Sequence, residues 1–267
     1  MKKDIIRIVS WNMNHWARSA AERRAAWEFL RSLNPTYAVV QEAVPPPEFP
    51  ADRCVYRPGG IGRRRPWGSA VVSFAGPITE VTSARSRFHK RATDIVHSHA
   101  GSAAVAATSD DLTLISMYGV MDDGYAVTSV QRVLSDLTPL LDSEHGKRVV
   151  LAGDWNLSTQ LEEPHRSRHR NVFDRLGTLG LVDALSLGKP HREPLPGCPC
   201  ADNACRHVRT HRHRRSAKPW QDDYVYVSRS LAPAVTVCDP VEGGSVDPWT
   251  LSDHCPLVVE LRADNRS

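Results

Sequence analysis

The stretch that decides the fold is Val149-Val150-Leu151-Ala152-Gly153-Asp154-Trp155-Asn156. Its apolar and small residues run straight into polar ones, which is typical of a buried strand that ends at the edge of a sheet. Side chains two positions apart on a strand point the same way, so Asp154 and Asn156 are predicted to share one side and Trp155 to face the core. Taken alone, the pattern favours a plain strand end closed by an Asx turn. The other strand ends of the chain decide between the two interpretations.

Five further predicted strands carry polar side chains at one end. The segments 5–11 and 37–40 run into such side chains, 112–118 ends on one, and 223–228 and 256–261 begin at or just after them. The side chains concerned are Asn12, Glu42, Tyr118, Asp223, Asp253 and His254. Carboxylates, an imidazole and a phenol held at strand ends are typical of a catalytic site on a rigid scaffold.

The remaining pattern predicts a few helices among many strands. Ser19 and Glu22 match a capping box that opens a helix running to about Ser32. A second helix is predicted at 127–141, and a short one at 171–179 after a loop at 165–170.

Pro and Gly predict a loop over 44–65, and further strands are expected at 68–73, 105–108 and 234–237. The element order predicts an α/β or α+β sandwich. We expect one domain over residues 1–267, with an insertion rich in Pro, Cys, His and Arg at about 186–219.

Composition and charge place the chain among ordinary globular proteins with a local basic region. It has 267 residues, 41% of them hydrophobic, and a formal net charge of +4. Eight Lys/Arg and two acidic residues lie between Lys189 and Lys218, which favours a phosphate-rich partner for that region. No segment reaches the roughly 18 apolar residues of a membrane span, and no signal-peptide pattern develops, so we expect a cytoplasmic protein without membrane contact.

The strand ends, taken in order, carry a family resemblance. The segments are Ser10-Trp11-Asn12-Met13-Asn14, Val39-Val40-Gln41-Glu42, Ser116-Met117-Tyr118, Gly153-Asp154-Trp155-Asn156, Asp222-Asp223-Tyr224 and Ser252-Asp253-His254-Cys255-Pro256-Leu257. This series resembles the endonuclease/exonuclease/phosphatase superfamily, which includes DNase I and exonuclease III. The resemblance implies a four-layer αββα sandwich of two packed β-sheets with outer helices, and a metal-assisted hydrolase of phosphate esters.

The resemblance also implies roles for individual residues. His254 matches the histidine that contacts the scissile phosphate, and Asp223 matches the carboxylate that orients it. Asp154 matches the residue that positions or deprotonates the attacking water, and Tyr118 would donate to the phosphate or to the leaving group. Asp222 is expected to face outward, because adjacent strand residues point to opposite faces.

The chemistry of phosphodiester hydrolysis fits the remaining residues. Charge that develops on the phosphoryl group needs a hard cation and a hydrogen-bond donor, and Asn156 would be that donor. Glu42 is the best direct ligand for Mg²⁺, with Mn²⁺ as the alternative, and Asn12 lies close by in this scheme. Asp253 would support these ligands without contacting the ion, or it would bind a metal ion at an alternative site. Each residue taken singly also suits a turn, a cap or a buried histidine, and only the joint pattern favours the active site.

One departure from the family concerns the segment after Tyr118. The chain reads Gly119-Val120-Met121, where DNA-repair members commonly place Pro and Asn. Activity on abasic sites is therefore in doubt.

The insertion contains a cluster with metal-ligand spacing. Cys198, Cys200, Cys205 and His207 lie within ten residues, and three thiolates with one imidazole suit a structural, tetrahedral Zn²⁺. The C-x-C spacing is tighter than the usual C-x₂-C. A disulfide and free thiols in a mobile loop remain as alternatives.

The basic part of the insertion leads directly to Asp223. Arg212, Arg214 and Arg215 are predicted to bind substrate phosphates, because guanidinium groups bind phosphates bidentately. The favoured function is a Mg²⁺-dependent nuclease acting on DNA or RNA. The alternatives are a phosphatase or phosphodiesterase for a small phosphorylated molecule, such as a sugar, a lipid headgroup or a nucleotide, and a nucleic-acid-binding protein with a vestigial site.

Overall fold

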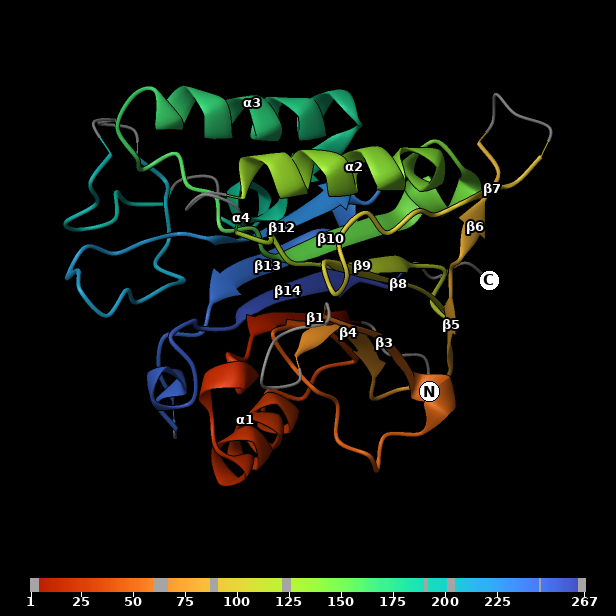
Figure 1. Ribbon diagram of the computed structural model, residues 1–267, viewed down its shortest axis with the longest axis horizontal. Helices are drawn as coiled ribbons and strands as arrows, with labels where there is room; N and C mark the ends of the chain where they lie inside the picture. Colours follow the sequence, from red (N-terminus) through yellow and green to blue (C-terminus); the bar gives the residue numbers. More distant parts are fainter. Residues whose placement is uncertain are drawn as a thin grey trace.

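The computed structural model describes residues 5–59, 67–86, 91–121, 126–189, 192–200, 205–244 and 246–263. Two six-stranded sheets lie face to face, and helices cover their outer faces (Figure 1). Helix α1 (Ala20–Ser32) lies on one outer face, whereas α2 (Val127–Leu141) and α3 (His165–Thr178) lie on the other. The four-layer αββα sandwich implied by the resemblance is confirmed.

The first sheet, here called sheet A, contains the N-terminal strand. Its strand order is β13-β14-β1-β2-β4-β3. Strands β1 and β2 are parallel, with Asn12 opposite Gln41, whereas β14 runs antiparallel to β1. The strands are β1 (Ile5–Asn12), β2 (Tyr37–Gln41), β3 (Cys54–Pro58), β4 (Gly68–Ser73), β13 (Val235–Pro240) and β14 (Leu257–Arg262).

The second sheet, sheet B, contains the strand that leads into Asp154. Its order is β11-β12-β10-β9-β8-β5. Strands β9 and β10 are parallel, whereas β12 runs antiparallel to β10 and places Asp223 opposite Asp154. The strands are β5 (Ile78–Glu80), β8 (Ala103–Thr108), β9 (Thr113–Met117), β10 (Val149–Asp154), β11 (Leu181–Asp183) and β12 (Asp223–Ser228).

The smaller elements lie in the connections. They are the two-stranded ribbon of β6 (Ser83–Ala84) and β7 (Thr93–Asp94), helix α4 (Ala184–Gly188), and the 3₁₀ turns η1 (His15–Ala17), η2 (Ala51–Arg53), η3 (Glu144–Arg148), η4 (Ala232–Ala234) and η5 (Pro248–Thr250). No helix in the described part of the chain has the length and apolar character that crossing a membrane requires.

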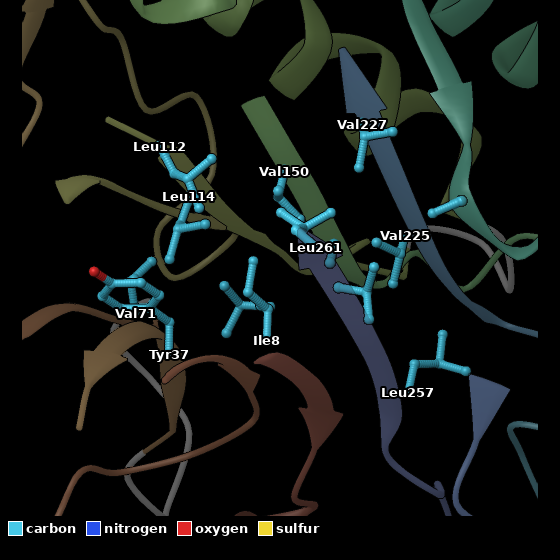
Figure 2. Close-up of a cluster of buried hydrophobic side chains, with 14 of the residues drawn as sticks. Ile8, Tyr37, Val71, Leu112, Leu114, Val150, Val225, Val227, Leu257 and Leu261 are labelled. Carbon is cyan, nitrogen blue, oxygen red and sulfur yellow. The ribbon is translucent and has the colours of Figure 1, made fainter. Parts of the chain in front are cut away.

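The core forms three apolar layers, one between the sheets and one under each helical face. Side chains from both sheets meet in the central layer, where Figure 2 shows Ile8, Tyr37 and Leu257 of sheet A with Val150 and Val225 of sheet B. A second layer packs sheet B against α2 and α3, and a third packs sheet A against α1. Both faces of each sheet are therefore buried, which leaves the strand ends as the place for polar chemistry.

Several predicted elements agree with the structure. The hydroxyl of Ser19 accepts a hydrogen bond from the backbone of Glu22, and the Glu22 carboxylate accepts one from the Ser19 backbone, so the capping box is confirmed. Helix α2 spans the predicted 127–141. Trp155 is buried under the helices of sheet B and stacks on Tyr226, with ring centroids 5.2 Å apart.

Two predictions were wrong. Part of the predicted loop 44–65 is strand β3, in which Val55 pairs with Val71 and is buried. The prediction missed this strand because it has only five residues and Pro residues lie around it. The predicted loop 165–170 is the start of α3, which begins at His165. This helix is polar on most of its surface, but His169, Val172 and Leu176 recur at helical spacing and are buried.

Candidate active site

Strand parity brings three of the predicted residues to the same edge. Alternate residues of β1, β10 and β12 point between the sheets, among them Ile8, Val150 and Val225. Asn12, Asp154 and Asp223 have the same parity. All three are buried, and the Asn12 amide donates to the Asp154 carboxylate over 2.8 Å. The end of β1 in sheet A therefore meets the end of β10 in sheet B.

Asp154 is held by amide donors. Besides Asn12, the Asn156 backbone N–H donates to Asp154 Oδ1 over 2.9 Å. The Asn156 side-chain amide donates to the carbonyl of Gly119 over 3.0 Å and to Asp154 Oδ2 over 3.3 Å. Burial raises the pKa of Asp154 well above its ordinary value. The carboxylate is thus fixed in orientation and has a high affinity for a proton.

His254 lies between two carboxylates. Its Nδ1 is 2.7 Å from Asp223 Oδ2, and its Nε2 is 3.8 Å from Asp154 Oδ2. Burial alone would lower the pKa of His254, but the charges of Asp223 and Asp154 raise it well above the ordinary value. The two carboxylates therefore favour the protonated form of the ring, which Asp223 holds and which faces Asp154.

Glu42 follows β2 in a left-handed backbone conformation, with φ of 46°. The residue is 7% exposed, and burial raises the pKa of its carboxyl group. Hydrogen bonds from Tyr118 and Asn12 and the charge of His254 counteract this rise. Glu42 and Tyr118 thus belong to the same cluster as Asn12 and His254.

Asp253 lies at the rim of this cluster and is tied to Asn14. The Asn14 amide donates to Asp253 Oδ1 over 2.7 Å. Burial would raise the pKa of Asp253, but the charges of His254 and His211 and the hydrogen bond from Asn14 lower it. The structure therefore brings together all eight residues predicted for catalysis and for Mg²⁺.

The residues present fit a hard divalent cation. Within the described residues, no hydrogen-bond partner reaches the buried side-chain oxygen of Asn14. Glu42 is a buried carboxylate, and burial raises its pKa even though the hydrogen bonds from Tyr118 and Asn12 and the charge of His254 act in the opposite direction. Mg²⁺ and Mn²⁺ take carboxylate and amide oxygens. Such an ion beside Glu42, Asn12 and Asp253 would place positive charge next to the buried Glu42 carboxylate.

The sequence did not predict that His211 and Asp222 form a pair at the site. Asp222 was expected to face outward, but its carboxylate lies 2.7 Å from His211 Nδ1 and is 16% exposed. The ring of His211 stacks on His254, with centroids 4.4 Å apart and an interplanar angle of 11°. The prediction for Asp222 was wrong because the arm that precedes β12 covers this side chain: His211 binds its carboxylate, and the Thr210 hydroxyl accepts from the backbone N–H groups of both Asp222 and Asp223.

The predicted zinc ligands form one cluster. Single donor atoms of Cys198, Cys200, Cys205 and His207 all lie within 4.8 Å of one another. The described residues include all six cysteines, and none of them forms a disulfide.

The basic arm reaches the active site through its backbone. The Arg212 N–H donates to the carbonyl of Asp253 over 2.8 Å. The Arg212 guanidinium lies 4.2 Å from the ring centroid of Trp249, and the Arg209 guanidinium lies 5.2 Å from the same centroid. No pattern in the sequence predicted these contacts. Arg214 and Arg215 are exposed. Of the three predicted substrate-binding arginines, Arg212 is thus the one whose backbone is joined to the catalytic loop.

Comparisons with known proteins agree with this geometry. Residues 9–254 match the model of the Endonuclease/Exonuclease/phosphatase family. A search of curated proteins found no match.

Among solved structures, an AP endonuclease from Archaeoglobus fulgidus is similar, with 18% identity, a TM-score of 0.63, and coverage of 95% of this chain and 98% of that one. The AP endonuclease LMAP from Leishmania major has 18% identity and a TM-score of 0.66 over 98% of this chain and 89% of its own. The 3′ phosphatase NExo from Neisseria, bound to a product DNA hairpin, has 21% identity and a TM-score of 0.63 over 96% of this chain and 99% of its own. At these identities the likeness shows the fold.

Proposed function

We propose that this chain, which belongs to the endonuclease/exonuclease/phosphatase family and is therefore a phosphoric ester hydrolase, cuts phosphodiester bonds of nucleic acids with the help of Mg²⁺. The observation that carries this proposal is the buried array of Asp154, His254 and Asp223 at the end of both sheets. A proton acceptor and a cation held side by side can serve the attacking water and the phosphate at once.

The residues divide the reaction between them. Asp154 accepts the proton of the attacking water as the water oxygen bonds to phosphorus, because its amide donors fix it and its pKa is high. His254, oriented by Asp223, contacts the negatively charged phosphate. Asn156 donates to the phosphoryl oxygen, which requires it to give up the longer of its two contacts, the one to Asp154. Tyr118 donates to the leaving oxygen as the P–O bond breaks.

Glu42, Asn12 and Asp253 would hold the Mg²⁺, and Mn²⁺ suits the same ligands. When bound, the ion neutralises the charge that develops on the phosphoryl group. The Cys/His cluster differs from this set because thiolates select softer ions such as Zn²⁺.

Two observations favour nucleic acid over a small phosphorylated molecule. The similar structures include AP endonucleases and a phosphatase bound to a DNA hairpin. The Arg212 backbone is bonded to the catalytic loop and its guanidinium lies over Trp249, and Arg214 and Arg215 follow it on the exposed arm. A row of cations binds an extended polyphosphate backbone better than a single phosphate group.

A substrate panel with Mg²⁺ or Mn²⁺ tests the proposal. It contains single- and double-stranded DNA, an abasic duplex, a 3′-phosphorylated duplex, RNA, and phosphorylated sugars and nucleotides. We expect hydrolysis of a nucleic acid that EDTA stops, and a loss of at least about 10³-fold in kcat for Asp154→Asn and His254→Ala. Asp52→Asn, which changes an exposed carboxylate in η2, is the control.

Near-normal turnover in either active-site variant would overturn the mechanism. Turnover of only the small phosphate esters would overturn the choice of substrate.

A further inference from the structure

The Cys/His cluster has the dimensions of an occupied metal site. Cys198 Sγ lies 3.3 Å from Cys200 Sγ and 3.6 Å from His207 Nδ1, and Cys205 Sγ lies 3.2 Å from the same nitrogen. Tetrahedral zinc, with Zn–S of about 2.3 Å and Zn–N of about 2.0 Å, separates its ligand atoms by roughly 3.5–3.8 Å. The four donor atoms therefore need only small shifts to enclose an ion.

The groups behind the cluster are arranged as supports for a metal site. His207 Nε2 lies 2.8 Å from the hydroxyl of Thr159, which fixes the ring with Nδ1 toward the thiols. The amide of Gln160 donates to Cys198 Sγ over 3.1 Å and to the carbonyl of Pro219 over 2.8 Å. Its carbonyl oxygen accepts from the Gln221 backbone over 2.7 Å. Thr159 and Gln160 lie in the loop that follows Asn156, so the cluster connects the insertion to a catalytic segment.

We propose that Cys198, Cys200, Cys205 and His207 form a structural Zn²⁺ site that fastens the insertion to the loop after Asn156. Four protein ligands close the coordination sphere and leave no position for water, which is typical of a structural site. The described residues between 192 and 222 form no helix and no strand beyond the isolated bridges of His211. A metal ion would supply the stability that secondary structure does not provide there. This site does not depend on the proposed hydrolytic activity.

Metal analysis and cobalt substitution test the zinc site. Protein purified without chelator should contain about one Zn per chain, and the Co²⁺-substituted protein should show thiolate-to-metal charge-transfer absorption. Cys205→Ser and His207→Ala should lose both signals. Cys54→Ser, on β3, and His213→Ala, on the same arm, should keep them. His207→Cys retains four ligands and should bind Zn²⁺ even if His207→Ala does not fold.

Wild-type protein without zinc and without the cobalt absorption would overturn this assignment. A zinc content that falls as far in Cys54→Ser as in Cys205→Ser would also overturn it.

A different observation carries a second inference, about His211. The backbone around His211 pairs with the catalytic loop: Arg212 N donates to Asp253 O over 2.8 Å, and Cys255 N donates to Thr210 O over 2.9 Å. This pairing lays the His211 ring flat on His254. Asp222 binds His211 as Asp223 binds His254, with 2.7 Å in both pairs.

We infer that His211 and Asp222 form a second dyad that positions His254. The hydrogen bond to Asp223 fixes one edge of the His254 ring but permits the ring to tilt about that bond. A second ring on its face restricts this tilt, and Asp222 holds the second ring in place. His211 is accordingly a positioning residue, and its effect on turnover rests on the proposed function.

Kinetics with two substitutions test the role of the ring. His211→Ala should lower kcat about tenfold or more and change KM less than threefold, because it disturbs orientation and not substrate affinity. His211→Phe keeps a flat ring and should restore most of the lost kcat. His97→Ala, which removes a histidine outside the site, should match wild type. Equal loss in the Ala and Phe variants, or an unchanged kcat in His211→Ala, would overturn the inference.

A spectroscopic measurement separates this inference from the proposed function. The Nδ1 proton of His254, shared with Asp223, should give a far-downfield proton NMR signal that His254→Ala removes. His211→Ala should shift or broaden that signal, and His211→Phe should keep it close to wild type. An unchanged signal in His211→Ala would overturn the positioning role. If the wild-type protein hydrolysed no phosphoester, the proposed function would fail, and the NMR result would still decide the role of the stack.

Discussion

At the scale of single residues, the site is built on backbone conformations that L-residues rarely adopt. Asn14, Glu42 and Asn156 have φ of 48°, 46° and 50°, and each such residue costs of the order of 1 kcal/mol. Gly153 has φ of 150°, and a Cβ there would lie 1.9 Å from the carbonyl oxygen of Met117. These turns end the strands abruptly, so that successive polar side chains stay at the edge of the sheets.

His15 holds one of these strained turns. Its backbone N–H donates to the carbonyl of Glu42 over 2.8 Å, and its Nδ1 accepts from the backbone of Val44 over 3.0 Å. The ring is buried, and burial, with the nearby charge of Arg23, lowers its pKa to about 3. A neutral His15 is therefore part of the folded state and clamps the turn that carries Glu42. These contacts give His15 a structural role.

The depressed pKa of His15 predicts a pH dependence of stability. The folded chain keeps this ring neutral down to about pH 3, whereas the unfolded chain protonates it below about pH 6.5. Between these values the unfolded state binds the extra proton, so the free energy of unfolding falls by up to about 1.4 kcal/mol per pH unit as the pH is lowered. Urea unfolding at pH 6.5, 5.5 and 4.5 measures this slope.

The matched variants are His15→Gln and His213→Gln. We expect His15→Gln to be less stable at pH 6.5 but to have a smaller slope, because the buried titrating group is gone. His213 is exposed on the arm, and its variant should keep the wild-type slope. Equal slopes in all three proteins would show that His15 does not govern the acid sensitivity.

At the scale of elements, the predictions succeeded where local chemistry and periodicity agree. The first turn of α1 was predictable because Ser19 and Glu22 satisfy each other within four residues. Helix α2 was predictable because Val130, Val133 and Leu134 form an apolar stripe. These signals need no knowledge of distant parts of the chain.

The failures occurred where tertiary contacts define the element. Strand β3 exists because Val55 finds Val71 across the sheet, and no feature of its own five residues outweighs the flanking prolines. Helix α3 begins among Arg and His because its few buried residues have a partner face on sheet B. The contacts between His211 and His254 and between Arg212 and Trp249 likewise join segments more than 30 residues apart.

At the scale of the whole molecule, the site depends on how two sheets are joined at one end. Strand alternation made the inward direction of Asn12, Asp154 and Asp223 predictable, but not which strand ends face each other. Hydrogen bonds between residues of β1 and β10 and of β2 and β9 connect the sheets there. Asn12 donates to Asp154, and the Gln41 amide donates to the hydroxyl of Ser116 over 2.8 Å. The Ser116 hydroxyl in turn donates to the carbonyl of Val40 over 2.9 Å.

The Ser116 bridge predicts a coupling between stability and the site. Ser116→Ala removes the acceptor of the buried Gln41 amide, and a buried donor without a partner costs about 1–3 kcal/mol. Because Gln41 immediately precedes Glu42, the same change should loosen the end of β2 and lower kcat. Ser10 is the matched control: it is also a buried serine that points between the sheets, and no described residue binds its hydroxyl. Ser10→Ala should leave Tm and kcat unchanged or raise Tm slightly. A similar loss in both variants would mean that general packing, and not the bridge between the sheets, holds this end of the sandwich together.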